Sequence, residues 1–534
     1  MTASQSIRPY VNQAYLLGLM MMAAGLTLSP FLMSLSQFWL ALVWFVDGFC
    51  TKSFRQKISR FWHNKAAVLL VAFYLMHVVG LLWTTDFQYA LKDLRVKLPI
   101  LVLPFIMSSM EPLDRKRFDI LMLVYVLSVF VATLFSFGSY VRHDYGDIRE
   151  ISHFISHIRF CLNIVFCIAV VGYYLFNRNT QWWNKVIQVL LLLWFVYQIY
   201  IFESLSGYVA LAGLLVVTVV YALLQWKTGK AWHIAIGVSV LAILLVGAFM
   251  LVRMARPLMQ VKPVDFNSLE QTTAKGNLYW HDTIYNSVED GKYVGLYYCR
   301  VEMQEAWPLR SDLPFEGTTL NGENLEATIA RYLTSKDLRK DAEGIMALTD
   351  EDIRNIEQGV ANYNNWRHPG LRARLSVTAF EYNMYRRSGN PNGGSLVQRI
   401  EFTRAALHII RQHPLFGVGT GDVPQSFVKA YDEIQSPLND EHRFRAHNQY
   451  LSIMIAFGAV GLALFLVALL YPWCSMKRCR TYLYTVFLVI MLLSMLAEDT
   501  LETQAGASLF AFLESVLLFA MPQEDDVKEK QPSQ

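Results

Sequence analysis

The chain has 534 residues, of which 54% are hydrophobic and 17% charged, and its formal net charge is +4. Soluble globular domains are about 45–50% apolar and about 25% charged, so this composition excludes an ordinary soluble enzyme. A mean hydropathy of +0.29 also excludes a largely disordered chain. The sequence therefore indicates a polytopic membrane protein.

Hydrophobic runs recur along the chain, and about 20 apolar helical residues suffice to cross the roughly 30 Å hydrocarbon layer of a bilayer. The runs cover residues 13–32, 35–50, 66–84, 96–110, 118–140, 158–177, 186–203, 207–225, 232–252, 448–471, 481–497 and 505–521. The fourth run is short and is broken by Pro99 and Pro104. These runs predict an all-α polytopic membrane protein with about twelve transmembrane helices.

The short connections between the runs predict the orientation of the helices, because cytoplasmic loops are rich in Lys and Arg. Residues 51–65 hold five Lys and Arg residues and no acid, and basic residues recur at 115–117, 227–230 and 477–480. All of these connections fall on the same side of a twelve-span bundle. We therefore expect them and both termini in the cytoplasm, and the long connection after the ninth run on the outer side.

Charged residues are concentrated in that long connection. The chain has 47 basic and 43 acidic residues, and 48 of these charges lie between Arg253 and Ala446. They make up about a quarter of that stretch, the charge density of a water-soluble domain. The predicted organisation is a body with spans 1–9 at residues 1–252, a loop domain at 253–446, spans 10–12 at 447–521 and a cytoplasmic tail at 522–534.

The loop domain is expected to be mixed but mainly helical. Around residues 289–291 (Glu-Asp-Gly), the stretch 276–310 alternates aromatic and β-branched residues, which predicts a strand pair with a Gly turn. Further along, residues 349–352 form a capping sequence that opens a helix, and 371–387 and 396–412 have helical periodicity. Cys299 is the one cysteine of this domain, so the domain cannot be held by a disulfide of its own.

Arginine is abundant in the second half of the loop domain. Between Arg367 and Arg411 there are eight arginines against two acids, Glu381 and Glu401. A basic amphipathic helix pair beside a membrane favours anionic headgroups or phosphates as partners. For any single arginine, a solvated basic face explains the pattern equally well.

Several common catalytic motifs do not occur in the sequence. There is no GxxxxGK[ST] phosphate loop, no GxGxxG after a strand, no HExxH and no GxSxG. We therefore expect no ATP hydrolysis, no metal, no cofactor and no nucleic-acid partner. An enzyme of this kind needs a substrate that arrives already activated.

Three segments stand together where the loop domain re-enters the membrane. Arg399 opens a helix that ends in a Pro-Leu-Phe-Gly-Val-Gly turn at 414–419, and residues 443–451 (RFRAHNQYL) lead into a span. This order resembles the O-antigen ligase family, the bacterial enzymes that move a glycan from undecaprenyl diphosphate to lipid A core. The resemblance covers about residues 396–520.

The resemblance implies a GT-C-like membrane glycosyltransferase in the bacterial inner membrane, with its active site facing the periplasm. His447 matches the family's essential His and Arg399 its loop Arg. Many members have Ser-Arg-Gly after a span where this chain has Ser204 to Gly207, and here Ser206 occupies the Arg position. We expect the substitute cation at Arg95, Lys97 or Arg159, and further substrate contacts at Arg404, Arg443, Arg445 and Asn448.

The chemistry of glycan transfer calls for the same two roles, a cation at the leaving phosphate and a base at the acceptor hydroxyl. Arginines stabilise the negative charge on a leaving phosphate with fixed, bidentate donors. A sugar hydroxyl needs a base that is neutral near pH 7, which suits an imidazole because the reference pKa of histidine is about 6.5. Arg443 and Arg445 are expected to disfavour a charged imidazole. The alternative is that His447 and Asn448 only cap the incoming span.

Three classes of function follow. The first is transfer of a glycan from undecaprenyl diphosphate to lipid A core in lipopolysaccharide biosynthesis. The second uses the same donor with another acceptor, as a glycan polymerase or a protein O-oligosaccharyltransferase. The third is a transporter, which the unsymmetrical nine-plus-three layout and the scarcity of mid-span charge disfavour. The expected partners are the lipid-linked glycan, its acceptor and membrane lipids.

Overall fold

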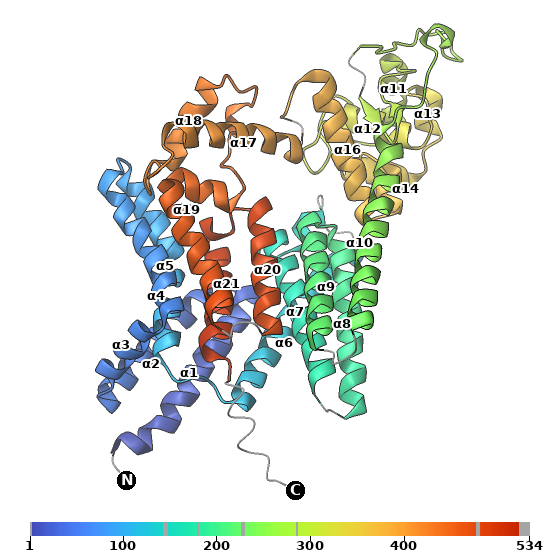
Figure 1. The fold of residues 1–534 in the computed structure, drawn as a ribbon. Helices are drawn as coiled ribbons and strands as arrows, with labels where there is room; N and C mark the ends of the chain where they lie inside the picture. Colours follow the sequence, from blue (N-terminus) through green and yellow to red (C-terminus); the bar gives the residue numbers. More distant parts are fainter. Residues whose placement is uncertain are drawn as a thin grey trace.

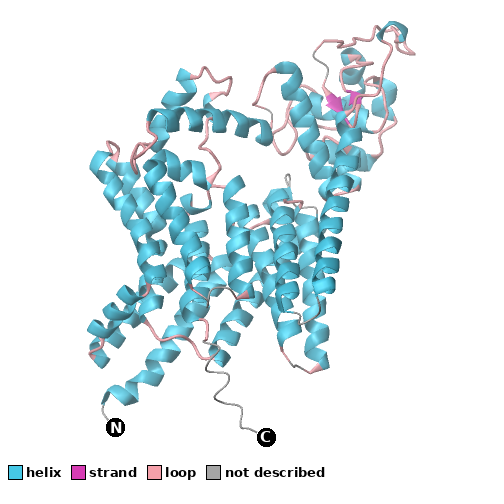
Figure 2. Cartoon of the chain, in the orientation of Figure 1, coloured by secondary structure: helices cyan, strands magenta, loops and turns pink. Residues whose placement is uncertain are grey.

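The computed structural model describes residues 3–142, 148–178, 181–225, 230–284, 287–392, 394–476 and 481–522. The described chain is mostly helical, with a body of long, roughly parallel helices and an insert at one end of it (Figures 1 and 2). The basic residues predicted at 477–480 and, apart from Pro522, the predicted cytoplasmic tail lie outside the described residues.

The body is built from the first ten helices and the last three, joined by short helical turns. Its elements are α1 (Ala3–Leu28), α2 (Pro30–Thr51), α3 (Phe54–His63), α4 (Lys65–Val79), η1 (Gly80–Trp83), α5 (Phe87–Ser109), α6 (Arg115–Arg142), η2 (Ile148–Ile151), α7 (His157–Asn177), α8 (Trp182–Phe202), α9 (Leu205–Gln225), α10 (Lys230–Met259), α19 (Gln449–Ser475), α20 (Tyr482–Ala497), η7 (Thr500–Glu502), α21 (Gln504–Ser515) and the π-helical η8 (Val516–Ala520).

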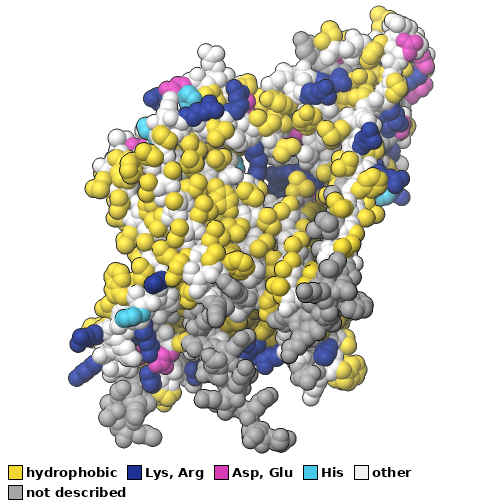
Figure 3. Space-filling model, in the orientation of Figure 1, with side chains coloured by type: hydrophobic (Ala, Val, Ile, Leu, Met, Phe, Trp, Pro, Cys, Tyr) yellow, Lys and Arg dark blue, Asp and Glu magenta, His cyan; other side chains and the backbone are white. Residues whose placement is uncertain are grey.

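Among the described residues, eight helices are long and apolar enough to cross a membrane. They lie in α1, α2, α4 with η1, α6, α7, α8, α9 and α19. Two further apolar helices, Tyr482–Ala497 and Gln504–Ala520, are shorter. Hydrophobic side chains cover the middle of the body and Lys and Arg gather near its ends (Figure 3). The chain is therefore a multi-pass membrane protein, and the predicted number of twelve spans stays a prediction.

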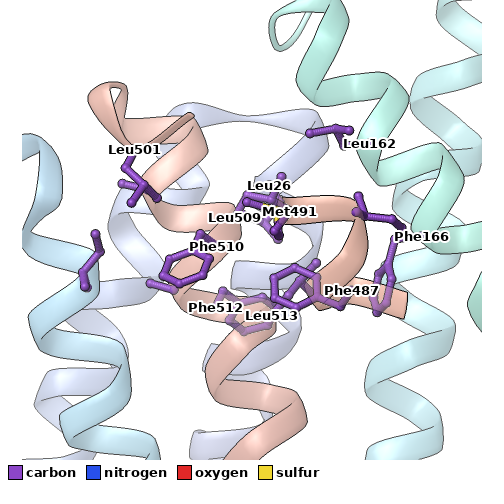
Figure 4. Close-up of a cluster of buried hydrophobic side chains, with 14 of the residues drawn as sticks. Leu26, Leu162, Phe166, Phe487, Met491, Leu501, Leu509, Phe510, Phe512 and Leu513 are labelled. Carbon is purple, nitrogen blue, oxygen red and sulfur yellow. The ribbon is translucent and has the colours of Figure 1, made fainter. Parts of the chain in front are cut away.

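The core of the body forms where α1, α7, α20 and α21 meet. Leu26 of α1, Phe166 of α7 and Met491 of α20 are buried there beside Phe510 and Leu513 of α21 (Figure 4). The last two helices thus pack against both the first helix and the middle of the chain. This packing places the short connection between α20 and α21 at the end of the body that faces the insert (Figure 1).

The insert contains one small sheet and several short helices. Its elements are η3 (Phe266–Ser268), β1 (Val288–Glu289), β2 (Lys292–Tyr293), α11 (Arg300–Ala306), η4 (Trp307–Leu309), α12 (Leu325–Ser335), α13 (Ala342–Met346), α14 (Asp350–Glu357), α15 (Tyr363–Arg367), α16 (Leu371–Ser388), α17 (Ser395–Gln412), α18 (Val423–Glu433) and η5 (Asp440–His442).

Two separate cores divide the insert. The distal part has its own core, in which Trp307, Tyr332 and Ile356 are completely buried. Helices α17 and α18 instead contribute Phe402 and Tyr431 to the core of the body. Helices α17 and α18 therefore belong structurally to the membrane body, and the distal part packs as a unit of its own.

The predicted strand pair is present but much shorter than expected. β1 and β2 pair antiparallel, with Val288 opposite Tyr293, and the turn residues Asp290 and Gly291 both have positive φ. An Asp-Gly turn of this kind suits a tight hairpin. The remainder of 276–310 is not a ladder, because Trp280 and Tyr298 form only an isolated bridge and the chain turns helical at Arg300.

The helical predictions in the insert agree with the structure. The Thr349 side chain and the Asp352 side chain form a reciprocal capping box at the start of α14. Helices α16 and α17 match the predicted ranges within one residue at each end. These helices form where the local spacing of apolar residues and a cap agree.

We expect the insert to face the periplasm, and a thiol placed on it should react in intact spheroplasts. Cys299 is buried and cannot report this, but Leu320 is 73% exposed. A Leu320→Cys protein should be labelled by a membrane-impermeant maleimide before lysis, whereas the exposed Cys50 and Cys474 should be labelled only after it. Labelling of Leu320→Cys only after lysis would place the insert in the cytoplasm.

Candidate active site

The glycine-rich turn that follows α17 docks against a break in α19. Gly458 has a non-helical φ of 62° inside α19, and a Cβ there would lie 2.1 Å from the carbonyl carbon of Leu415. Val418 and Gly419 donate backbone hydrogen bonds to the carbonyls of Ile455 and Ala456. Only glycine permits both the backbone conformation and the close approach at position 458.

The same turn is also tied to the start of α5. Gly421 N–H donates to the Thr84 hydroxyl over 3.1 Å, and Asp422 accepts the backbone N–H groups of Thr85 and Asp86. Because Val418, Gly419 and Gly421 already have partners, their amides do not form a free phosphate cradle. The turn instead fixes α19 relative to α4 and α5.

His447 lies in the loop that leads into α19. It adopts a left-handed conformation with φ of 47°, which is uncommon for a non-glycine residue but more frequent for His than for most. Asn448, the next residue, caps α19 by accepting the N–H of Leu451 and donates to the Leu496 carbonyl. The capping role therefore belongs to Asn448, and the His447 side chain is left for other contacts.

The imidazole of His447 is packed between aromatic rings and a carboxylate. Its ring centroid lies 5.5 Å from that of Phe402 and 6.3 Å from that of Phe444. Nδ1 is 3.6 Å from Oδ1 of Asp499, and the side chain is 33% exposed. The ring is thus held on one side and remains accessible on another.

Asp499 belongs to an acidic loop that joins α20 and α21. Burial raises the pKa of a carboxyl, but the His447 side chain and Arg445 outweigh it, and the pKa of Asp499 lies below its ordinary value. The neighbouring Glu498 accepts from Arg399 Nη2 over 2.9 Å, while Arg399 Nη1 donates to the Ala497 carbonyl over 2.5 Å. The loop therefore brings Arg399 and His447 to the same acidic segment.

Glu502, at the end of the same loop, is the most heavily bonded acid of the cluster. It accepts from Lys97 over 2.8 Å, from Arg445 over 3.0 Å and from Gln449 over 3.1 Å. Burial alone raises the pKa of a carboxyl, but Lys97 and Arg445 lower the pKa of Glu502 to about 2. We call the group of Asp93, Lys97, Arg399, Arg445, His447, Glu498, Asp499 and Glu502 the charge cluster.

Several predicted substrate contacts are engaged elsewhere. Lys97 is almost completely buried between Asp93 and Glu502, so it is not a free cation for phosphate. Arg443 pairs with Asp432 and Asp440, away from the imidazole. Arg445 is itself paired with Glu502. The two arginines are thus not unpaired cations beside His447, because each is paired with at least one acid.

Two other candidates lie outside the charge cluster among the described contacts. Arg404 pairs with the buried Glu401 one turn earlier on α17, and its side chain is 54% exposed. Arg95 is exposed on α5, two residues before the buried Lys97. Neither residue has a contact with Arg399 or His447 among the described contacts.

Arg159, at the start of α7, lies beside the acidic loop. Its guanidinium interacts electrostatically with Glu498 and Asp499, and Nη1 donates to Ser156 over 2.8 Å. Nε is buried and has no hydrogen-bond partner among the described residues. Of the three positions predicted to replace the arginine missing at Ser206, Arg159 is the one with an unused donor beside the cluster.

The space around the cluster shows how a substrate can approach. Behind Glu502 a cavity of about 20 Å³, lined by Tyr89, Arg445 and Ser452, has room for about one water and is too small for a sugar or a phosphate. On the face shown in Figure 3 the molecule is hollowed below α17, with Lys and Arg side chains inside the hollow. A large substrate therefore has to enter from the open side of the cluster.

Three side chains of the cluster could also hold a cation. His447, Glu498 and Asp499 each offer one ligand atom, and these atoms lie within 4.8 Å of one another. Imidazole and carboxylate ligands suit several divalent metals. The sequence motifs predict that no metal is bound, and these three residues are the place to test that prediction.

Comparison with known proteins identifies the class. The apolar helices and the cluster at their ends define a multi-pass membrane protein with a charged site. Residues 360–466 match the family model described as O-antigen ligase, and this range contains Arg399, the glycine-rich turn and His447. The match bears out the resemblance over residues 360–466, which are about a fifth of the chain. No curated protein matches the chain.

The sequence motifs did not reveal how the acids of the cluster are used. From the sequence alone, Glu498, Asp499 and Glu502 could bind acceptor hydroxyls or cap the neighbouring helices. Their spacing does not indicate which residues they pair with. A usable signal was present, since three acids in five residues are unusual between two apolar helices. Asp93, four residues before Lys97 on α5, is the other acid that spacing could have paired.

Removal of the Glu502 charge should destabilise the protein. A Glu502→Gln protein should lose about 3 kcal/mol of unfolding free energy at pH 7, because buried cations lose their partner. The native pKa of about 2 lies below the unfolded value, so the Glu502 contribution is present above about pH 4.3 and is lost as pH falls towards about 2. Thermal unfolding in detergent measures this.

The difference between wild type and Glu502→Gln should therefore shrink in acid. Glu323→Gln, which changes an exposed acid of the insert, is the matched control and should leave stability unchanged. Equal stability of wild type and Glu502→Gln at pH 7 would mean that the Glu502 pairs contribute no net stabilisation.

Proposed function

We propose that this protein transfers a glycan from undecaprenyl diphosphate to an acceptor hydroxyl, foremost in the ligation of O-antigen to lipid A core. The observation that carries the proposal is the meeting of His447, Arg399 and the acidic loop 498–502 at one end of the membrane helices. The match of residues 360–466 to the O-antigen ligase family supports the choice of reaction class.

In this proposal His447 is the general base. Its Nδ1 faces Asp499 at 3.6 Å, which orients the ring and leaves Nε2 to accept a proton. The acceptor oxygen attacks the anomeric carbon as its proton passes to His447, and the carbon–oxygen bond to the diphosphate breaks. The electron pair stays on the phosphate oxygen, so a single displacement inverts the anomeric centre and leaves undecaprenyl diphosphate.

Arginines supply the positive charge that the leaving diphosphate needs. Arg399 keeps about a third of its side chain exposed while it pairs with Glu498, so a phosphate can reach it. Arg159 adds a second guanidinium beside the same loop and is our choice for the arginine missing at Ser206. Guanidinium groups fixed before the reaction stabilise charge that develops during it.

Replacement of His447 should abolish most of the activity without unfolding the protein. His447→Ala should slow glycan transfer about 10²-fold or more, the usual contribution of a general base. His408→Ala is the control, because His408 lies on α17 in contact with Glu433, outside the cluster. Transfer is measured with purified protein, lipid-linked glycan and lipid A core, and near-normal rates for a folded His447→Ala protein would leave the base unassigned.

Metal removal should not change the rate. EDTA followed by gel filtration is expected to leave transfer at its starting value, because arginines supply the charge that a metal would. Loss of activity that Mg²⁺ or Mn²⁺ restores would instead assign a cation to His447, Glu498 and Asp499.

Any substitution of Arg399 should reduce the rate of glycan transfer. Arg399→Ala should reduce transfer strongly, and Arg399→Lys should retain a little, because an ammonium keeps the charge but not the bidentate fork. Arg404→Ala is the matched control on the same helix, since Arg404 pairs with Glu401 instead of the cluster. Normal activity of both Arg399 variants would make this residue structural.

A further inference from the structure

A groove of about 940 Å³ opens in the distal part of the insert. Its walls come from residues 276–280, residues 298–301, α12 and α16. This volume lies at the upper end of the about 300–1,000 Å³ range of ligand sites. Most of the groove lies before residue 360, outside the segment that matches the O-antigen ligase family.

One wall of the groove is aromatic and apolar. Trp280 is 60% exposed and Leu278 is 76% exposed, although both line a concave surface. The Trp280 backbone exchanges two hydrogen bonds with Tyr298, of 2.8 and 3.1 Å, and its ring meets the Tyr298 ring edge to face at 6.1 Å. Trp280 is thus a firmly held flat surface whose ring remains open.

The polar edge of the groove consists of paired charges. Arg300 donates to Glu326 and Glu316, and Glu326 also accepts the Tyr298 hydroxyl over 2.7 Å. Across the groove, Arg331 donates to Glu289 over 2.7 Å and stacks on the Phe380 ring at 3.7 Å. Each arginine that lines the groove therefore has its own carboxylate.

These pairs decide the charge of the ligand that fits. A phosphate or an acidic lipid would meet guanidinium groups that are already neutralised, together with the carboxylate of Glu326. A neutral ligand with many hydroxyls meets no such penalty, because guanidinium and carboxylate edges donate and accept hydrogen bonds respectively. The groove thus favours a neutral polar chain with apolar faces.

We infer that the groove binds the glycan chain of the transferred substrate. A sugar ring presents an apolar face of C–H groups and a rim of hydroxyls, which match the Trp280 ring and the charged edge. The inference rests on the proposed function, which makes a glycan the substrate, and it adds a second contact region remote in sequence from His447.

The position of the groove links it to the charge cluster through two helices. Phe380 and Met384 of α16 line the groove, and α16 contacts α17, the helix that carries Arg399. Figure 1 shows the distal insert and α17 on the same end of the membrane body. A long glycan held at Trp280 can therefore have its reducing end at the cluster, while the distal sugars rest on the insert.

The test is glycan binding without transfer. Full-length protein in detergent is titrated calorimetrically with polysaccharide released by mild acid from the lipopolysaccharide of the native host cells. Trp280→Ala should weaken binding about 10-fold or more, as expected when an exposed aromatic anchor is lost. Trp280→Phe should stay within about 3-fold of wild type, and Glu326→Gln should weaken binding.

A control variant separates the groove from the rest of the protein. Leu320→Ala removes an equally exposed apolar side chain outside the groove and should bind normally. The titration measures binding without transfer, so failure of the catalytic proposal does not affect it. The inference is wrong if wild type and Trp280→Ala bind the polysaccharide equally well. It is also wrong if wild type does not bind the polysaccharide at all.

Discussion

The buried carboxylate of Glu502 is the interaction on which the arrangement of the site depends. It joins Lys97 of α5, Arg445 of the loop before α19 and Gln449 at the start of α19. These positions lie 53 to 405 residues from Glu502 in the sequence. Without Glu502, Lys97 would keep only Asp93 and Arg445 only Asp499 as an acidic partner among the described residues, and the Gln449 amide would lose its acceptor. The network therefore sets the path of residues 445–449, and with it the position of His447. Arg445 donates as well to the Tyr89 hydroxyl over 3.0 Å, which adds a second bond between this loop and α5.

Backbone contacts reinforce this arrangement from the other side of α19. The glycine-rich turn 414–419 fits into the break at Gly458, and the Thr420 hydroxyl donates to the His77 carbonyl over 2.6 Å. The glycines that characterise the motif are thus required by packing, since they let one backbone approach another. The predicted site residues lie on the flanking segments, where Arg399 precedes the turn and His447 follows it. The turn is therefore a structural element between the two predicted site residues.

Local sequence patterns predicted the secondary-structure elements better than the contacts between residues distant in the sequence. Helices α14, α16 and α17 followed from caps and periodicity, which act within a few residues. The strand pair was overestimated because alternation alone does not supply a neighbouring strand, and only two residues on each side of Asp290 and Gly291 pair. The motif predicts His447 and Arg399 as site residues, and their roles stay a prediction. The sequence did not predict that Lys97 and Arg443 are paired with acids. Local spacing could have paired them with Asp93 and Asp440, four and three residues away. Their other partners, Glu502 and Asp432, lie at positions that spacing does not predict.

The charge balance of the cluster has a consequence for how a diphosphate can bind in the proposed reaction. The three cations Lys97, Arg399 and Arg445 face the four acids Asp93, Glu498, Asp499 and Glu502, so these paired groups hold no excess of positive charge. Of these pairs, Arg399 with Glu498 is the more exposed, whereas Lys97 with Glu502 is almost completely buried. In this reaction an incoming phosphate would displace Glu498 from Arg399 at a lower free-energy cost than it would displace Glu502 from Lys97. The buried pairs keep the scaffold rigid while the outer pair opens, and the binding of donor then depends on one replaceable carboxylate instead of the whole network.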